Sequence, residues 1–300
     1  MKELVGDARR VLVAGAGGGY DVLGAVPLLH DLEADGREVH LASLSFTYLN
    51  GLDRARQIAE VGCLYEVGGD AAVPRAYCPE AWLARHLGRP IWCFDKVGVG
   101  LLANAYRWLA RELAIDCVVL VDGGIDLILR GDETSLGTPA EDLASLAAVA
   151  QLELPARAAC LGLGSELRDG IAHEQAFARI AELTRDGGYL GAHALVGATE
   201  RGRRYRAAME FVTGNQAGLK HSHVHKVVLA AMTGDYGAVA PHVWLSALLP
   251  MHWWFDLHAV ARGHRFLADL RDTESIWDVA ARIEAARKTL AIRGRTSIPI

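Results

Sequence analysis

The residues best suited to chemistry in this chain follow a glycine-rich turn near the N-terminus. A short apolar run, Val11-Leu-Val-Ala-Gly15, leads into glycines at 17, 18 and 19, then Asp21, and an apolar helix-like segment begins directly. Glycines remove Cβ atoms, and the free N–H groups at a helix start point at a bound anion. We therefore expect Gly17, Gly18 and Gly19 to hold an anionic group, with phosphate the leading candidate, and Asp21 to orient the ligand.

The turn overlaps the fingerprint of dinucleotide-binding sites without completing it. Tyr20 stands where the final glycine would be, and the second strand, which runs from Val39 to Ser45, lacks the acidic residue that holds a ribose hydroxyl. An enzyme that uses NAD or S-adenosylmethionine stays an alternative, although the sequence lacks that acidic residue. Ser43 is a candidate phosphate contact, or it bonds only its own backbone. A glycine turn required only for packing is the remaining alternative.

A second group of acidic residues lies in Val121-Asp-Gly-Gly-Ile-Asp-Leu-Ile-Leu-Arg-Gly-Asp-Glu133. Asp122 comes at the end of an apolar strand, and ligands of doubly wound sheets bind at that carboxyl edge. Carboxylates there hold a divalent metal, act as a general base, or bind an amine or hydroxyls. We predict Asp122 and Asp126 as catalytic residues and metal ligands, with Mg²⁺ the cofactor to consider. Asp132 and Glu133 belong either to the site or to a solvated turn.

Two further segments carry candidate site residues. The fifth predicted strand ends in another glycine turn, so Ser165 and Glu166 are candidates for substrate contact, with a self-satisfied loop as the alternative. Downstream, Ser222 resembles a helix cap, which separates His221 from His223 and His225 and argues against a three-histidine zinc site. A histidine pKa lies near working pH, so His223 or His225 is the predicted second acid–base group.

Alternating apolar runs and helical patterns must position these residues. They predict a doubly wound, Rossmann-like α/β fold with a parallel sheet. Thr138-Pro-Ala-Glu141 is predicted to begin one helix as a capping box. The expected strands are 10–15, 37–43, 91–94, 116–121 and 157–162, and the expected helices are 22–34, 52–61, 79–87, 98–114 and 139–151.

The pattern changes after about residue 186. We therefore predict a core over 1–186 and a helical C-terminal elaboration over 187–300, packed over the carboxyl edge of the sheet without forming an independent domain. The aromatic run Met251-His-Trp-Trp-Phe255 is expected in the hydrophobic core.

Composition limits the partners that we expect. The 300 residues carry a net charge of −5 without a basic run, which disfavours nucleic acid as the main partner. Five cysteines without a Cys-x-x-Cys pair indicate buried thiols and a cytoplasmic location. The N-terminus lacks an apolar signal core, and no apolar stretch suits a membrane span. A small-molecule ligand is the expected partner, and the aromatic C-terminal part leaves room for a homodimer.

Two motifs also carry a family resemblance. At VLVAGAGGGYDVLGA and VDGGIDLILRGDETSLGTPAEDL the chain is similar to the bacterial and archaeal family catalogued as domain of unknown function 1152, and the likeness extends through most of the chain. The resemblance implies that both motifs are family hallmarks, and it implies no particular reaction. The family more often has Asp-Gly-Glu in the turn after the fifth strand, where this chain has Ser165-Glu166, so no role for Glu166 follows from it.

These observations predict an enzyme that acts on a small polar, anionic metabolite by acid–base hydrolysis or group transfer. Neither a Gly-x-Ser-x-Gly elbow nor a Gly-Lys-Ser/Thr phosphate loop is present, so serine hydrolases and ATPases lack their usual support. Besides the nucleotide-cofactor enzyme, a non-catalytic metabolite-binding protein remains an alternative.

Overall fold

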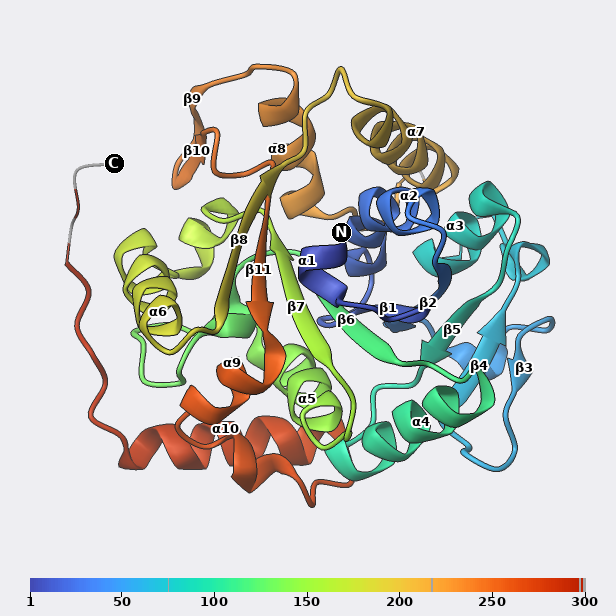
Figure 1. Ribbon diagram of the computed structural model, residues 1–300, viewed down its shortest axis with the longest axis horizontal. Helices are drawn as coiled ribbons and strands as arrows, with labels where there is room; N and C mark the ends of the chain where they lie inside the picture. The colour runs from blue at the N-terminus through green and yellow to red at the C-terminus, as the bar shows by residue number, and fades with distance from the viewer. Residues whose placement is uncertain (75, 217, 297, 299–300) are drawn as a thin grey trace.

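A nine-stranded sheet forms the centre of the molecule (Figure 1), in the order β3-β4-β5-β2-β1-β6-β7-β11-β8. The computed structural model describes residues 1–74, 76–216, 218–296 and 298. Five neighbouring strands are parallel, which confirms the Rossmann-like fold and places all five predicted strands within one residue at each end. They are β1 (Arg10–Gly15), β2 (Glu38–Leu44), β5 (Ile91–Phe94), β6 (Cys117–Asp122) and β7 (Ala156–Leu161).

Antiparallel strands extend the sheet on both sides. Next to β5 lie β4 (Leu64–Val67) and the short β3 (Arg56–Gln57), while β11 (Met251–Asp256) and β8 (Tyr189–Ala194) follow β7. The prediction of a helix over 52–61 is therefore wrong, because this segment forms turns and then pairs Arg56 and Gln57 with β4.

The C-terminal part shares the central sheet. Since β8 and β11 both belong to that sheet, residues 187–300 supply strands of the sheet as well as helices that pack on it. The expectation of a helical elaboration was therefore too narrow. Trp253, Trp254 and Phe255 are buried on β11, which confirms the aromatic run as core. The remaining C-terminal strands, β9 (Gly237–Ala240) and β10 (Val243–Leu245), form a separate hairpin.

Helices cover both faces of the sheet (Figure 1), and each layer encloses its own hydrophobic cluster. One layer holds α1 (Lys2–Val5), α2 (Val26–Ala34), α3 (Pro79–Leu87), α7 (Glu200–Asn215) and α8 (His223–Met232). The other holds α4 (Val99–Glu112), α5 (Pro139–Val149), α6 (His173–Arg185), α9 (Leu257–Gly263) and α10 (Ile276–Thr289). Short 3-10 turns lie at Asp21–Ala25, Leu49–Gly51, Gly69–Ala71, Asp126–Ile128, Ser165–Asp169 and Leu267–Leu270.

The order of the strands fixes where a ligand can bind. From β1 the chain moves outward through β2 to β5, then crosses back to β6 on the other side of β1 and continues to β7. Two adjacent strands whose connections run in opposite directions leave a crevice at their carboxyl ends. Gly15 and Val121 are partners in register, so the segments that begin at Ala16 and Asp122 open into the same crevice.

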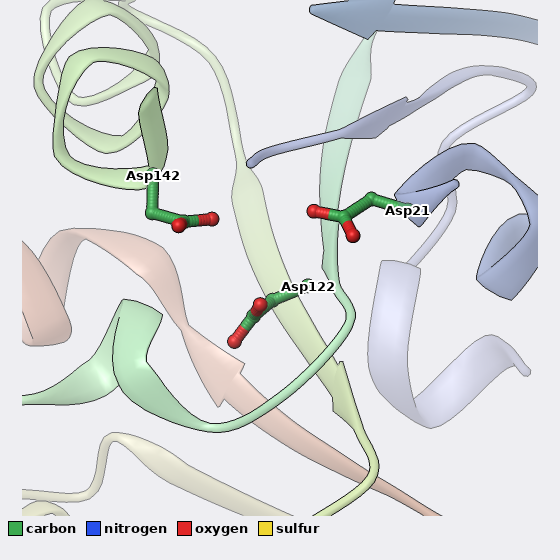
Figure 2. Close-up of side chains that lie close together, drawn as sticks. All are labelled: Asp21, Asp122 and Asp142. Carbon is green, nitrogen blue, oxygen red and sulfur yellow. The ribbon is translucent and has the colours of Figure 1, made fainter. Parts of the chain in front are cut away.

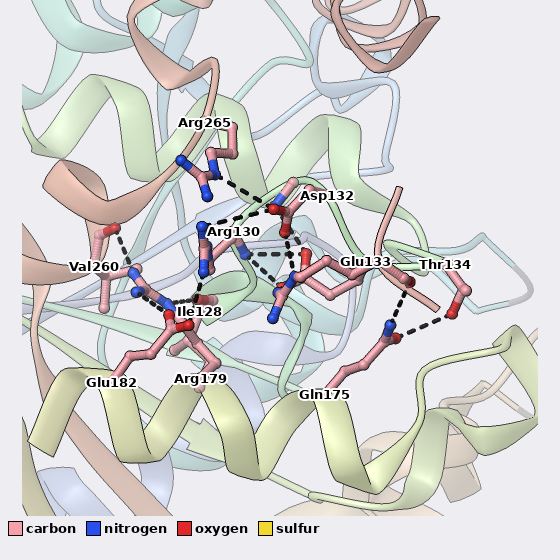
Figure 3. A network of polar contacts seen from close by, with 12 residues as sticks. Ile128, Arg130, Asp132, Glu133, Thr134, Gln175, Arg179, Glu182, Val260 and Arg265 are labelled. Carbon is pink, nitrogen blue, oxygen red and sulfur yellow. Dashed lines mark hydrogen bonds and ion pairs between the residues drawn. The ribbon is translucent and has the colours of Figure 1, made fainter. Parts of the chain in front are cut away.

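Asp132 and Glu133 belong to a structural network remote from that crevice (Figure 3). Glu133 is fully buried and accepts hydrogen bonds from the backbone N–H of Arg130 and Gly131, at 3.0 and 2.9 Å. Arg293 contacts both acids, at 2.8 Å from Asp132 and 2.5 Å from Glu133. The pair therefore anchors the C-terminal segment and belongs neither to the lining of the cavity in that crevice nor to a solvated turn.

Cys63, Cys78, Cys93, Cys117 and Cys160 are all buried with free thiols, as expected. Over the residues that the structure describes, none of the helices has the length and apolar character needed to cross a bilayer.

The network predicts a large loss of stability for Glu133→Ala. Removing the carboxylate leaves the N–H groups of Arg130 and Gly131 without their partner and takes away one of the two carboxylates that Arg293 contacts, so the free energy of unfolding should fall by about 3 kcal/mol. Urea denaturation measures this change. Glu112→Ala is the control, since this carboxylate is 46% exposed and pairs with the neighbouring Arg111. A loss for Glu133→Ala as small as that of the control contradicts the assigned role.

Candidate functional site

A cavity of about 440 Å³ lies at the carboxyl ends of β1 and β6. Both glycine motifs line it, through residues 17–21 and 122–126, together with Glu166 and the start of α8. The structure places Asp122 and the glycine turn side by side. The cavity is lined by Gly17, Gly18, Tyr20, Asp21, Phe46, Tyr77, Asp122, Gly123, Asp126, Thr138, Asp142, Glu166, Arg168, Lys220, His221, Ser222, His223 and Val224.

Three aspartates converge inside this cavity (Figure 2). Asp21 begins the turn after the glycines, Asp122 ends β6, and Asp142 lies in the first turn of α5. One carboxylate oxygen from each lies within 4.8 Å of the other two. Ser145 on α5 donates to the carbonyl of Ala16 at 2.7 Å and so fixes that helix against the glycine turn. Three separate elements thus direct oxygen ligands into one small volume.

Asp126 and Glu166 add two more buried carboxylates at the edge of this group. Glu166 accepts a 2.6 Å hydrogen bond from the N–H of Ile125, which connects the turn after β7 to the segment after β6. Asp122 accepts a weaker one from Leu127, at 3.4 Å. Five carboxylates therefore face one cavity, and the two basic side chains on its lining, Arg168 and Lys220, are exposed at its mouth.

Glycines in both motifs make room for these carboxylates. A Cβ on Gly17 would lie 2.6 Å from Asp142 Oδ1 and 2.8 Å from Asp21 Oδ2, closer than atoms approach without a bond. A Cβ on Gly124 would lie 2.5 Å from the Glu166 carboxyl group. The glycines are required here because their missing side chains let acidic groups approach one another and the backbone.

The proximity of the acids raises their pKa values. Burial raises the pKa of Asp21 to about 7, and the negative charge of Asp126 adds to the effect. Burial and the neighbouring aspartates also raise the pKa values of Asp122 and Asp142 well above the ordinary range. Burial raises the pKa of Asp126 to about 6, although a hydrogen bond with Glu166 opposes this. The cluster therefore lacks the positive charge that would stabilise its ionised form.

The glycine turn differs from the anion cradle expected from the sequence. The N–H of Gly17 donates to Asp21 Oδ2 at 2.7 Å, so a ligand would have to displace this bond. Gly18 faces the cavity but packs against the ring of Phe46, and Gly19 packs against Phe46 and Tyr77 outside the cavity lining. An anion placed here would also meet the aspartates directly.

Of the two histidines predicted as acid–base groups, His223 is the one that lines the cavity. Its Nε2 is buried without a hydrogen-bond partner among the described residues. Burial and the nearby Arg168 lower the pKa of His223, which keeps the imidazole neutral and ready to accept a proton. The predicted helix start is confirmed, because Ser222 caps α8 by accepting a hydrogen bond from the N–H of His225.

Three other predicted residues point away from the cavity. His225 is fully buried, with Nε2–H donating to the Tyr20 carbonyl at 2.9 Å and Nδ1 accepting from the Tyr205 hydroxyl. Ser43 is buried beneath the sheet edge and donates to the carbonyl of Leu44. Ser165 is buried outside the cavity lining. None of the three is among the described residues that line this cavity.

Asp142 is the acidic site residue that the sequence did not reveal, and Phe46, Tyr77, Arg168 and Lys220 also line the cavity without having been predicted. The segment before Asp142 was explained as a capping box, but Thr138 makes no side-chain capping bond and instead lines the cavity. The available signal was a second acidic residue directly after Glu141, in the first turn of a helix that follows β6. The first turn of such a helix opens toward the crevice in a doubly wound fold.

Comparison with protein families agrees with this geometry. A family model described as "Protein of unknown function (DUF1152)" matches residues 12–289. The chain belongs to the DUF1152 family. The matched span includes the glycine turn, the three aspartates and the start of α8, so the cavity lies within the family's own domain. Among curated proteins the comparison found no match.

The two buried histidines contribute a loss of stability in acid, opposite in sign to the contribution of the buried carboxylates. Burial lowers the pKa values of His225 and His252 to about 4, whereas both titrate near 6.5 in the unfolded chain. Between these values the unfolded state binds more protons than the native state. Each histidine should therefore lower the free energy of unfolding by up to about 1.4 kcal/mol per unit of decreasing pH, while the carboxylates with raised pKa values change it in the opposite direction.

Urea denaturation between pH 7 and 4 tests this expectation. His225→Gln retains one donor and one acceptor without the titration, so its stability should fall less steeply with acid. His242→Gln is the matched control, because this histidine is exposed. Equal slopes for the wild type and His225→Gln would contradict the burial of a neutral imidazole.

Proposed function

We propose that this DUF1152 protein is a divalent-cation-dependent enzyme that acts on a small anionic metabolite by hydrolysis or group transfer. The carrying observation is the convergence of Asp21, Asp122 and Asp142, whose ligand oxygens lie within 4.8 Å of one another at the switch point of the sheet. Carboxylate oxygens are the ligands of hard cations such as Mg²⁺. A cation would neutralise negative charge that otherwise has no buried counter-ion in this group.

An unpartnered ligand atom supports the cation site independently. Asp142 is only 4% exposed, and its Oδ1 has no hydrogen-bond partner among the described residues. Opposite ligands of Mg²⁺ lie about 4.2 Å apart and those of Ca²⁺ about 4.8 Å apart, from their usual metal–oxygen distances. The observed spacing therefore admits a hard divalent cation after at most a small closure of the aspartates.

The anionic character of the metabolite follows from what surrounds the carboxylates. A cation held by few carboxylates keeps coordination positions for substrate phosphate oxygens. Across the cavity mouth, Arg168, Lys220 and the N-terminus of α8 present positive charge and N–H dipoles. A phosphate or carboxylate between the two sides would contact positive charge on both.

The side chains around the cavity would then have separate roles in the reaction. The bound cation would polarise the reacting group, while Arg168 and Lys220 hold the remaining negative charge of the metabolite. His223, with its free buried Nε2, is placed to accept a proton from a nucleophile or to return one to a leaving group. Asp126 and Glu166 orient the segment after β6 and, through it, Asp122.

The same geometry disfavours a dinucleotide cofactor. In Rossmann enzymes the pyrophosphate lies over the first glycine turn and accepts from its N–H groups. Here the Gly17 N–H donates to Asp21, and Asp142 lies beside it. Both aspartates would repel a pyrophosphate without a cation between them.

Cation binding should depend on Asp142. Replacing Asp142 by Asn removes one anionic ligand and should weaken Mn²⁺ binding by a factor of about 10–100, as judged from the effects of altering metal-site residues. Isothermal titration calorimetry of the wild type, Asp142→Asn and the exposed control Asp53→Asn measures the affinities. Unchanged Mn²⁺ affinity in Asp142→Asn, or no binding by the wild type, contradicts the proposed site.

Turnover should depend on His223. With Mg²⁺ present, phosphate release from a panel of phosphate monoesters should fall by a factor of about 10²–10⁴ in His223→Gln. Mn²⁺ affinity should stay near the wild-type value, because His223 is not among the proposed ligands. Phosphate esters that bind without turnover in the wild type would instead favour a metabolite-binding protein.

A further inference from the structure

One wall of the cavity is built from aromatic rings. We call Phe46, Tyr77, Tyr20 and His221 the aromatic wall, and all four line the cavity. Phe46 and Tyr77 both approach Gly19, and the ring of Tyr20 lies 6.3 Å from those of Tyr77 and His221. The wall thus runs from the end of β2 to the start of α8.

The aromatic wall is held in place before any ligand arrives. Thr47 donates from its side chain to the Tyr77 carbonyl at 3.0 Å and from its N–H to Ser45 Oγ at 3.1 Å, which connects the two segments that carry Phe46 and Tyr77. Gln216 donates to the Tyr20 hydroxyl at 3.0 Å. The bond from Gln216 also occupies the Tyr20 hydroxyl, and the ring of Tyr20 is inclined by 62° to that of Tyr77 and by 55° to that of His221.

Phe46 is the exposed member of the wall. Its side chain is 43% exposed, although glycines 18 and 19 leave just enough space for its ring to rest on the turn. Lys96 Nζ lies 5.0 Å from the ring centroid and adds positive charge at this end of the cavity. An exposed aromatic side chain at the cavity lining, with a cation over its ring, is suited to a planar ring that carries an anionic group.

We infer that the metabolite is a nucleoside phosphate whose base stacks on Phe46 while its phosphate reaches the cation held by the three aspartates. This inference rests on the proposed function, because it assigns the organic part of the same ligand. Phe46 follows β2 and Asp122 follows β6, on opposite sides of β1. The two strand ends are roughly 9–10 Å apart, so the ligand needs a spacer between ring and phosphate, which a ribose supplies.

A sugar phosphate fits this wall less well than a nucleotide. Sugar hydroxyls require hydrogen-bonding partners, and the Tyr20 hydroxyl and the Thr47 side chain already have theirs within the protein. A base gains from stacking on any aromatic face. The nucleotide should therefore bind more tightly than its own ribose phosphate.

The experiment compares AMP, GMP, CMP and UMP with ribose 5-phosphate, each by calorimetry at saturating Mn²⁺. At least one nucleotide should bind the wild type about tenfold more tightly than ribose 5-phosphate, since base–aromatic stacking commonly contributes this much. Phe46→Ala should remove that advantage and leave the affinity for ribose 5-phosphate unchanged. Phe46→Trp should retain it, and Tyr48→Ala is the control, because Tyr48 is 75% exposed and does not line the cavity.

The outcomes separate this inference from the proposed function. If all five phosphates bind equally, or if Phe46→Ala weakens ribose 5-phosphate as much as the nucleotide, the stacking inference is overturned while the cation site stands. If Mn²⁺ binds and none of the phosphates does, both the anionic substrate and the stacking inference fail. Loss of Mn²⁺ binding in Phe46→Ala would show that the ring only supports the fold, and would also overturn the inference.

Discussion

The mutual repulsion of buried carboxylates is the constraint on which the rest of this structure depends. Asp21, Asp122 and Asp142 come from three elements that could each direct their side chains elsewhere, yet their oxygens lie within 4.8 Å of one another. Placing like charges together out of water raises their free energy, and the raised pKa values of all three express that cost. A fold retains such an arrangement when the packing around it is strong and a ligand uses it.

The packing that holds the cluster is visible in the layers of the fold. β1 and β6 are central strands with their side chains buried on both faces, so the turns that follow them have little freedom to move apart. Gly17 and Gly124 complete this arrangement, because a Cβ at either position would displace an acidic group. Glycines that resemble a phosphate-binding turn in the sequence therefore make space for the carboxylates in the structure.

Much of the fold could be predicted because apolar runs report burial directly. All five parallel strands, the Ser222 cap and the convergence of Asp122 with the glycine turn followed from short-range patterns and the switch-point rule. The helix expected over 52–61 failed because pairing with β4, a tertiary contact, decided that segment. β8 and β11 were unexpected members of the sheet for the same reason.

The site was harder to predict than the fold, because side-chain direction depends on elements distant in sequence. His223 and His225 are two residues apart on the same helix. Only the hydrogen bonds of His225 with Tyr205 and Tyr20, which are distant in sequence, show that His225 is buried inside the protein. Asp142 was hidden by a plausible capping motif whose bond does not form.

The segment from Asp122 to Glu133 joins the site to the C-terminal part of the chain. Its first half supplies two acids to the cavity, while its second half is fixed by Arg293 and by backbone bonds to Glu133. Because Asp126 lies between these two ends, its position depends on both the crevice and the C-terminal anchor. The C-terminal tail therefore adds Arg293 to the contacts that hold this segment, together with α6, where Arg179 donates to the Ile128 carbonyl at 2.9 Å and Glu182 pairs with Arg130.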